Sequence, residues 1–346
     1  MIGEKDYFQE YRLLQDRPSR LLLSVLFIGL ILFPLISRGD SHNYYVFVAN
    51  LLFINIITAV GYNIVVGNTG LISLGHSGFL AIGAYASIIL MTKIGAPFPI
   101  AILSAGIITA VLGFIVGLPA LKLEGPYLAI ATLGFGIAVE QVLGLSKSLT
   151  GGMDGIDTPP YSMFGHVMNT DVSLGPIVLS SEKQIYYVIL FVTVVLTFAA
   201  ARMMKSRVGR GFTAVRDSAV AARSLGVNVT YFKSLAFAVS AFYMGVAGSL
   251  NAHMVNHINP SQYGLMLSIT MVAMIVVGGL GSITGSILGA VLFTLLHQIL
   301  AAQDHLNAII TGLVMVLIII FEPRGLSGVW RTMRGFFKRK QVVRGD

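Results

Sequence analysis

The sequence has no cysteine, a single tryptophan and few charged residues. Without cysteine the chain cannot form a disulfide, attack a substrate through a thiol or bind a metal through thiolate ligands. Only 11% of its 346 residues are charged, whereas soluble domains have roughly 25%, and 55% are hydrophobic. This composition excludes an ordinary soluble domain and indicates a protein embedded in a membrane.

Charge is absent from two long stretches, between Asp40 and Lys93 and between Lys233 and Asp304. Each stretch can hold more than one membrane helix, since a spanning helix needs about 20 apolar residues. The sequence therefore predicts an all-α fold, a polytopic helical membrane protein with about ten transmembrane helices. The predicted spans are Leu21–Ile36, Tyr44–Val66, Ser77–Thr92, Phe98–Leu118, Tyr127–Leu145, Gln184–Ala201, Ser234–Val255, Leu265–Gly281, Ser286–Leu300 and Leu306–Phe321.

The motifs of several enzyme classes are also missing. The chain contains no Gly-Lys pair, hence no G-x-x-x-x-G-K-[ST] phosphate-binding loop, and neither H-E-x-x-H nor G-x-S-x-G. We therefore expect a chain that is not an enzyme, with no catalytic residue, no metal site and no cofactor bound by the chain itself. The chain itself is therefore not expected to hydrolyse ATP.

Few ionisable residues fall inside the predicted spans, where each is a candidate functional residue. Glu140 lies near the outer end of its span, and we interpret it as an interface residue. His297 is expected to be a hydrogen-bonded interior histidine, and His76 could reach water or a backbone carbonyl. A relay of buried carboxylates, typical of proton-coupled carriers, is lacking.

Basic residues decide the predicted orientation. With the N-terminus inside, cytoplasmic segments hold 19 of the 23 Lys and Arg residues, as the positive-inside rule expects. Both termini are then cytoplasmic. The predicted organisation is a cytoplasmic N-terminal segment at 1–20, a transmembrane domain at 21–321 and a basic cytoplasmic tail at 322–346. Within the domain, 146–183 forms an extracytoplasmic loop and 205–233 a cytoplasmic loop.

The cytoplasmic loop has a local helix signal. Asp217 or Ser218 can cap a helix through Ala219–Leu225, and Gly226 can end it in a left-handed conformation. A helix of about seven residues is not stable alone in water, so it should dock on something. A membrane surface and a cytoplasmic protein are both reasonable docking surfaces. Because the carboxylate relay of a proton-coupled carrier is missing, the energy for any transport must come from another source. This favours a cytoplasmic protein over the membrane surface as the docking partner.

Glycine gathers at two junctions between predicted spans, at 61–83 and at 278–289. Small residues let helices pack closely in lipid, and they also permit broken or re-entrant backbone where protein covers it. We expect packing to explain most of these glycines. The two clusters are consistent with an internal repeat, but they share too few residues to establish one.

Six blocks, in order, resemble one family. They are GNTGLISLGHSGFLAIGAY from Gly67, LEGPYLAIATLGFG from Leu123, TGGMDGI from Thr150, RDSAVAARSLGVN from Arg216, NPSQYGLMLSITMVAMIVVGGLGSITGSILG from Asn259 and PRGL from Pro323. The chain is similar to the permease subunits of high-affinity branched-chain amino-acid ABC importers, and within them to the M-type partner of two paired permeases. Related permeases for urea and short amides keep the substrate open.

The resemblance implies a multi-pass protein of the cell inner (cytoplasmic) membrane, bacterial or archaeal, that moves Leu, Ile or Val by alternating access. It implies a heterodimer with a second permease subunit, two cytoplasmic ATPase subunits that bind ATP with magnesium, and an extracytoplasmic solute-binding protein, with no nucleic acid. The short cytoplasmic helix would couple ATPase closure to the pore, and 146–183 could receive the binding protein. The implied ATPase-coupling residues are Arg216, Asp217, Ala221, Ala222, Arg223, Leu225 and Gly226.

Two other classes of transporter are alternatives. An ion-coupled secondary carrier would transport in vesicles without nucleotide, but the lack of carboxylates disfavours it. A passive channel would need to conduct alone, and the short cytoplasmic helix disfavours it. For the translocation path we expect the residues of the two glycine-rich junctions to line or shape it: Gly70, Ser73, Gly75, His76, Phe79, Gly278, Gly279, Gly281 and Ser282.

Overall fold

The computed structural model describes residues 28–34, 40–118, 123, 125–160, 162–163, 166–167, 172–174, 177–300, 304–321 and 325–328. The expected N-terminal segment at 1–20, most of the first expected span and nearly all of the tail at 322–346 lie outside these residues. Residues 28–34 of the first expected span are helical.

Long helices coincide with the second to tenth expected spans. The principal helices are α3 (Asp40–Val65), α4 (His76–Ile94), α5 (Phe98–Gly117), α6 (Pro126–Leu145), α8 (Ser181–Lys205), α11 (Val229–Val255), α12 (Leu265–Gly278), α13 (Ile283–Ile299) and α14 (Asp304–Phe321). Short helices lie between them: α7 (Lys147–Thr150), α9 (Arg207–Asp217) and α10 (Ala219–Ser224), with 3₁₀ turns η3 (Gly152–Asp154) and η4 (Pro260–Tyr263).

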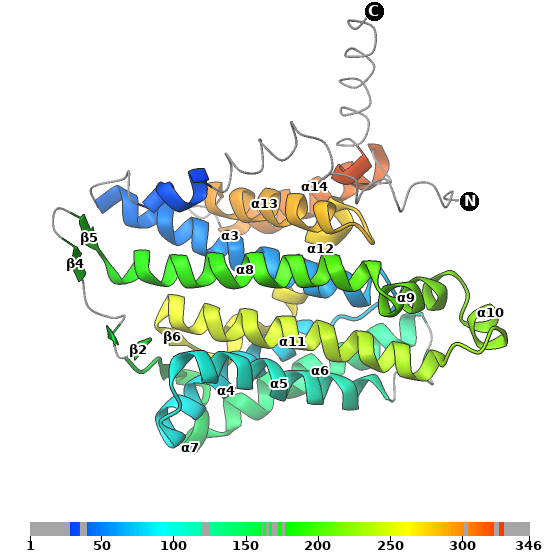
Figure 1. Cartoon of the computed structure of the whole chain (residues 1–346), viewed down its shortest axis with the longest axis horizontal. Coiled ribbons are helices and arrows are strands. Elements are labelled where there is room, and N and C mark those ends of the chain that lie inside the picture. The colour runs from blue at the N-terminus through cyan, green and yellow to red at the C-terminus, as the bar shows by residue number, and fades with distance from the viewer. Residues whose placement is uncertain are drawn as a thin grey trace, which may run out of the picture.

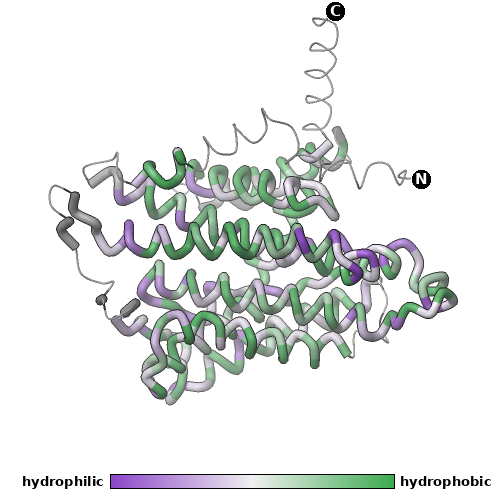
Figure 2. The backbone as a smooth tube through the Cα atoms, in the orientation of Figure 1, coloured by the Kyte–Doolittle hydropathy of each residue, from purple (hydrophilic) through white to green (hydrophobic). Residues whose placement is uncertain are grey.

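Seven helical segments among the described residues are long and apolar enough to cross a membrane. Figure 2 shows apolar residues along the middle of the helices and hydrophilic ones toward their ends, many of them around α9. The chain is therefore an all-α, multi-pass membrane protein. The count of ten spans and the cytoplasmic position of both termini stay predictions.

Some expected boundaries are wrong by several residues. α8 and α11 each begin before the expected span because hydropathy marks only the lipid-embedded part of a helix, and polar ends can also be helical. α12 ends at Gly278, not at Gly281, because Gly279 and Gly281 have φ values of +119° and +79°. With 14 residues, α12 rises only about 21 Å, less than the roughly 30 Å of a bilayer core.

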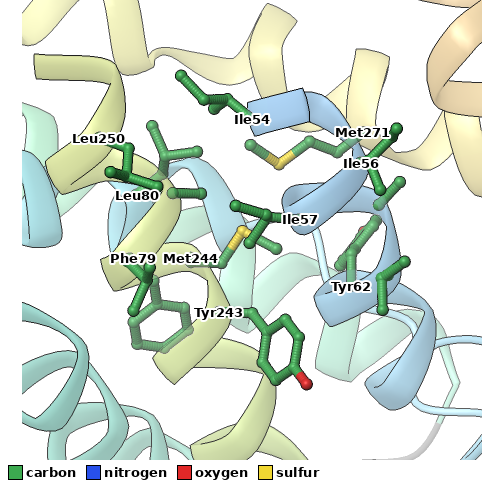
Figure 3. Packing of buried hydrophobic residues seen from close by; sticks show 14 of the residues in the cluster. Ile54, Ile56, Ile57, Tyr62, Phe79, Leu80, Tyr243, Met244, Leu250 and Met271 are labelled. Atoms are coloured by element: carbon green, nitrogen blue, oxygen red, sulfur yellow. The ribbon is translucent and has the colours of Figure 1, made fainter. Parts of the chain in front are cut away.

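The core of the molecule is built around α11. Figure 3 shows side chains from α3, α4, α11 and α12 packed together, among them Ile57, Leu80, Met244 and Met271. Close approach of the helices depends on small residues, as it must where lipid removes the hydrophobic drive for association. For example, a Cβ placed on Gly83 of α4 would lie 2.7 Å from the carbonyl carbon of Gly245 in α11.

The two ends of the bundle differ (Figure 1). One end carries α9 and α10, which project beyond α8 and α11. The opposite end carries the insert at 146–183, expected only as a loop, which contains α7, η3 and several short strands. Two antiparallel pairs lie within the insert: β2 (Ser162–Met163) with β3 (His166–Val167), and β4 (Val172–Leu174) with β5 (Ile177–Leu179). In a third pair, β1 (Ile156–Asp157) of the insert pairs with β6 (His257–Ile258), which follows α11.

Candidate functional site

Helices α9 and α10 form a corner at one end of the bundle. α9 begins at Arg207 after Ser206, whose hydroxyl accepts a hydrogen bond from the amide of Val208 at 3.1 Å. α10 begins after Ser218, whose hydroxyl accepts from the amide of Ala221 at 3.2 Å. Of the two expected caps, Ser218 is therefore the one used, and Asp217 is exposed at the end of α9.

The end of α10 is also as the sequence predicts. Leu225 follows the last helical residue, and Gly226 has φ +81°. The amides of Gly226 and Val227 donate to the carbonyl oxygens of Arg223 and Ala222, each at 3.0 Å. The left-handed glycine thus lets the chain turn back toward α11 while the last carbonyls of α10 remain hydrogen-bonded.

The two faces of α10 have different environments. Ala222 packs with Val215 of α9 and Val229 of α11 in a small core separate from the main one. One surface on which α10 docks is therefore its own chain, a possibility that the sequence analysis did not include. The other face carries Val220 and Leu225, which are 79% and 84% exposed. An apolar surface on so short a helix remains available for a further partner.

The first glycine-rich junction is a break between α3 and α4. Residues 66–75 are not helical, yet most of them are buried. Their backbone is held from several sides: the amide of Leu74 donates to Oγ1 of Thr132 in α6 at 3.0 Å, and the hydroxyl of Tyr62 in α3 donates to the carbonyl oxygen of Ser73. Irregular backbone inside a membrane domain is tolerated when protein covers it in this way.

His76 begins α4 and is completely buried. Its Nδ1 lies 2.8 Å from Oγ of Ser73, and its Nε2 lies 2.9 Å from Oγ of Ser240 in α11. The partners expected from the sequence, water or a backbone carbonyl, are therefore wrong. With both ring nitrogens bonded to hydroxyls, His76 joins the break to α11.

The second glycine-rich junction is the turn between α12 and α13. Oγ of Ser282 caps α13 by accepting from the amide of Gly285 at 3.0 Å. Asn63 of α3 reaches this turn: its Oδ1 accepts from the amide of Gly281 at 2.9 Å, and its Nδ2 donates to the carbonyl oxygen of Ser282 at 3.2 Å. The two junctions, more than 200 residues apart in sequence, are thus joined.

Arg216 lies where the two junctions meet. A Cβ placed on Gly281 would lie 2.7 Å from Nη1 of Arg216, and one placed on Gly70 would lie 3.5 Å from its Cγ. The side chain therefore passes along one junction and ends at the other. Sequence analysis missed Asn63 and Ser240, whose only signal is a polar side chain in a long apolar run.

The expected path residues separate into two groups. Gly70 and Gly281 lie beside Arg216, whereas Ser73, His76 and Phe79 are buried against α3, α6 and α11. Gly75 and Gly278 face backbone: a Cβ there would lie 2.8 Å from the carbonyl carbon of Thr132 and 2.7 Å from that of Gly285, respectively. Gly75, Gly278 and the buried residues Ser73, His76 and Phe79 therefore pack against other parts of the chain. That the translocation path runs along any of the expected residues stays a prediction.

The insert is fastened at the opposite end of the bundle. Through β1 and β6, residues that follow α7 pair with residues that follow α11, and the amide of Thr158 donates to the carbonyl oxygen of Asn256 at 2.8 Å. In the TGGMDGI block, Gly151, Gly152 and Gly155 all have positive φ. Nδ1 of His257 lies 2.7 Å from Oδ1 of Asp157.

Glu140 and His297 are the other two ionisable residues considered within the expected spans. Glu140 is partly exposed beside Gly264, at the end that carries the insert, as an interface position requires. His297 is partly buried, and its Nδ1 has no hydrogen-bond partner among the described residues, so the expected hydrogen bond is not found at that nitrogen. Within that part of the chain, no three His, Asp or Glu side chains gather as a metal site would require.

Comparison with known proteins assigns the chain to a family. The model of the family described as "branched-chain amino acid transport system / permease component" matches residues 44–320. The high-affinity branched-chain amino acid transport system permease proteins LivM of Salmonella typhimurium and of Escherichia coli K12 are each 34% identical over 327 residues, 90% of this chain and 76% of theirs.

The permease protein LivH of Escherichia coli K12, from the transport system of the same name, is 24% identical over 79% of this chain and 90% of its own. No solved structure matches the chain. The family match covers most of the chain, including both glycine-rich junctions, α9 and α10. The chain is therefore a member of the branched-chain amino acid transport system permease family.

Proposed function

We propose that this chain is the membrane-spanning subunit of an ATP-driven ABC importer for branched-chain amino acids in a bacterial or archaeal inner membrane. It moves its substrate by alternating access, and α10 couples that movement to a separate ATPase. The relatives at 34% identity, named for branched-chain amino acid transport, support this substrate class over urea or short amides.

The observation that carries the proposal is the two-faced character of α10. Its inner face is fixed to α9 and α11 through Ala222, so a force on α10 is passed to both helices. Its outer face exposes Val220 and Leu225 beyond the end of the bundle (Figure 1). Asp217 and Arg223 are exposed nearby and supply charges of both signs. This surface suits the groove of a cytoplasmic ATPase subunit.

The proposed assembly contains a second permease, two ATPase subunits and an extracytoplasmic solute-binding protein. Escherichia coli K12 contains LivM and LivH, two different permease proteins of one named system, and this chain resembles both. That pair supports a heterodimer in which this chain takes the LivM place. ATP with magnesium is bound by the ATPase subunits, and the insert at the opposite end receives the binding protein.

Removal of α10 tests the coupling. In cells or proteoliposomes with the full set of subunits, deletion of Ala219–Leu225 should abolish ATP-dependent leucine uptake, while the chain still reaches the membrane. A milder variant, Val220→Ser with Leu225→Ser, should reduce co-purification of the ATPase because it removes apolar surface from the contact. Membrane fractionation with immunodetection checks insertion.

The matched control is Leu149→Ser, which removes an exposed apolar side chain at the opposite end of the bundle. It should leave co-purification of the ATPase unchanged. Normal uptake after deletion of α10 would exclude the coupling role. Uptake driven by an imposed ion gradient, without nucleotide or ATPase, would instead support a secondary carrier.

A further inference from the structure

Arg216 occupies a position that ATPase contact does not explain. It is the penultimate residue of α9, close to α10, and its half-buried side chain lies against Gly70 and Gly281. Its Cγ lies beside Gly70, and its guanidinium lies beside Gly281. These contacts are with its own chain, whereas the resemblance implies only pairing with a charge on the ATPase.

Gly281 leaves room for this side chain, whereas a Cβ on Gly70 would only make ordinary contact with it, 3.5 Å from its Cγ. Gly70 and Gly281 have φ values of +71° and +79°, so both also need the conformational freedom of glycine. At Gly281 any side chain would press against Nη1 of Arg216, because the added Cβ would lie only 2.7 Å away. The guanidinium of Arg216 therefore lies where the turn between α12 and α13 meets the break between α3 and α4.

The two glycine-rich junctions are held together, so a shift of one is passed to the other. Asn63 bonds both the amide of Gly281 and the carbonyl oxygen of Ser282. Close contact between Gly67 and the amide of Gly281 adds to this link. Arg216 thus rests on a pair of junctions that come from different parts of the chain and are joined through α3.

The helices on both sides of α10 reach the same break. α9, before α10, contacts it at Gly70 through Arg216. α11, after α10, contacts the residue that follows the break, because Oγ of Ser240 lies 2.9 Å from Nε2 of His76. Since α9, α10 and α11 share the small core around Ala222, a displacement of α10 acts on the break at Gly70 and on His76, the residue that follows the break.

We propose that Arg216 is a positioning residue that transmits the movement of α10 to the two glycine-rich junctions. The inference rests on the proposed function, because it supposes that an ATPase moves α10. The guanidinium of Arg216 presents a planar fork of N–H groups that suits the backbone carbonyls of a turn. Lysine has no such fork and cannot replace it.

The test compares Arg216→Ala and Arg216→Lys with the unchanged chain in the complete, reconstituted importer. The measured quantity is leucine transported per ATP hydrolysed, together with the ATPase rate and subunit co-purification. Arg216→Ala should keep assembly and ATP hydrolysis but lower transport per ATP by about tenfold or more, within the range of measured coupling between sites. Arg216→Lys should give an intermediate ratio.

Arg210→Ala is the matched control, because it removes the same charge from an exposed position on the same helix. It should leave the transport-to-ATP ratio unchanged. Loss of ATPase binding in Arg216→Ala would overturn the inference in favour of a docking role, and an unchanged ratio would overturn it outright. If the unchanged importer moves no leucine with ATP, the proposed function itself fails, independently of Arg216.

A structural readout covers the case in which Arg216→Ala assembles poorly. The chain has no cysteine, so spin labels at Ser224→Cys on α10 and Ile72→Cys in the break report one distance. Both positions are exposed. In detergent, the distance distribution should be narrow with Arg216, broader with Arg216→Lys and unchanged by Arg210→Ala. Equal widths with Arg216 and Arg216→Lys would contradict the inference.

Discussion

Gly278 is required because a side chain there would have no space, whereas Gly226 is required because its backbone has a left-handed conformation. A Cβ on Gly278 would lie 2.7 Å from the carbonyl carbon of Gly285 and would push α12 away from α13. At Gly226 nothing lies within 4 Å of an added Cβ, but φ is +81°. The two residue-scale requirements can therefore be tested separately, since a substitution at Gly226 adds strain without a clash.

Gly226→Val should lower ATP-dependent uptake and loosen the end of α10. A β-branched residue in the left-handed region costs about 1–2 kcal/mol or more, a large cost for a helix of six residues. Hydrogen exchange at the amides of Gly226 and Val227, which close the turn, measures the loosening directly. Faster exchange at these amides should accompany the loss of uptake.

The matched control is Gly226→Asn, because asparagine tolerates the left-handed region better than other residues with a Cβ. It should retain most of the uptake and slow exchange. If Gly226→Asn and Gly226→Val were equally impaired, the cause would lie in a partner contact at this position and not in backbone conformation.

Elements defined by local sequence could be predicted, and those defined by distant partners could not. The α10 region could be predicted because its cap at Ser218 and its left-handed glycine depend on adjacent residues. The pairing of β1 with β6 could not, because each strand has two residues and its partner is about 100 residues away. The position of Arg216 between Gly70 and Gly281 could not be predicted either, because only folding brings these two distant segments together.

The β1–β6 pair should also respond to pH. The hydrogen bond with Asp157 is the main cause that raises the pKa of His257 above its ordinary value of about 6.5, aided by the carbonyl oxygen of Asp154 at 3.1 Å from Nε2. A raised pKa in the folded state means that protonated His257 stabilises the pair. This contribution is full below pH of about 6.5 and is lost as pH rises through the raised pKa.

Hydrogen exchange at the amide of Thr158, which bonds to Asn256 beside the pair, measures the effect. After correction for intrinsic exchange, this amide should be better protected at pH 6 than at pH 8. His257→Gln should remove the difference because glutamine does not titrate. Greater protection at pH 8 in the unchanged chain would contradict the assigned direction.

At the scale of the whole molecule, α11 connects the two ends of the bundle. Its 27 residues rise about 40 Å, from the small core beside α10 to the strand pair that holds the insert. Along the way it is buried among α3, α4 and α5, and it bonds His76 through Ser240. α11 is therefore one continuous, well-packed helix between the two ends.

Orientation in the membrane is the remaining prediction at this scale. Basic residues place α10 in the cytoplasm, and α7 lies at the opposite end of the bundle (Figure 1). Because the chain has no cysteine, Leu225→Cys and Leu149→Cys each provide a single reactive thiol at an exposed position. In intact spheroplasts a membrane-impermeant maleimide should label Leu149→Cys at once and Leu225→Cys only after the membrane is permeabilised. The reverse pattern would place α10 outside the cell, where no ATPase could reach it, and would exclude both the coupling role of α10 and the transmitting role of Arg216.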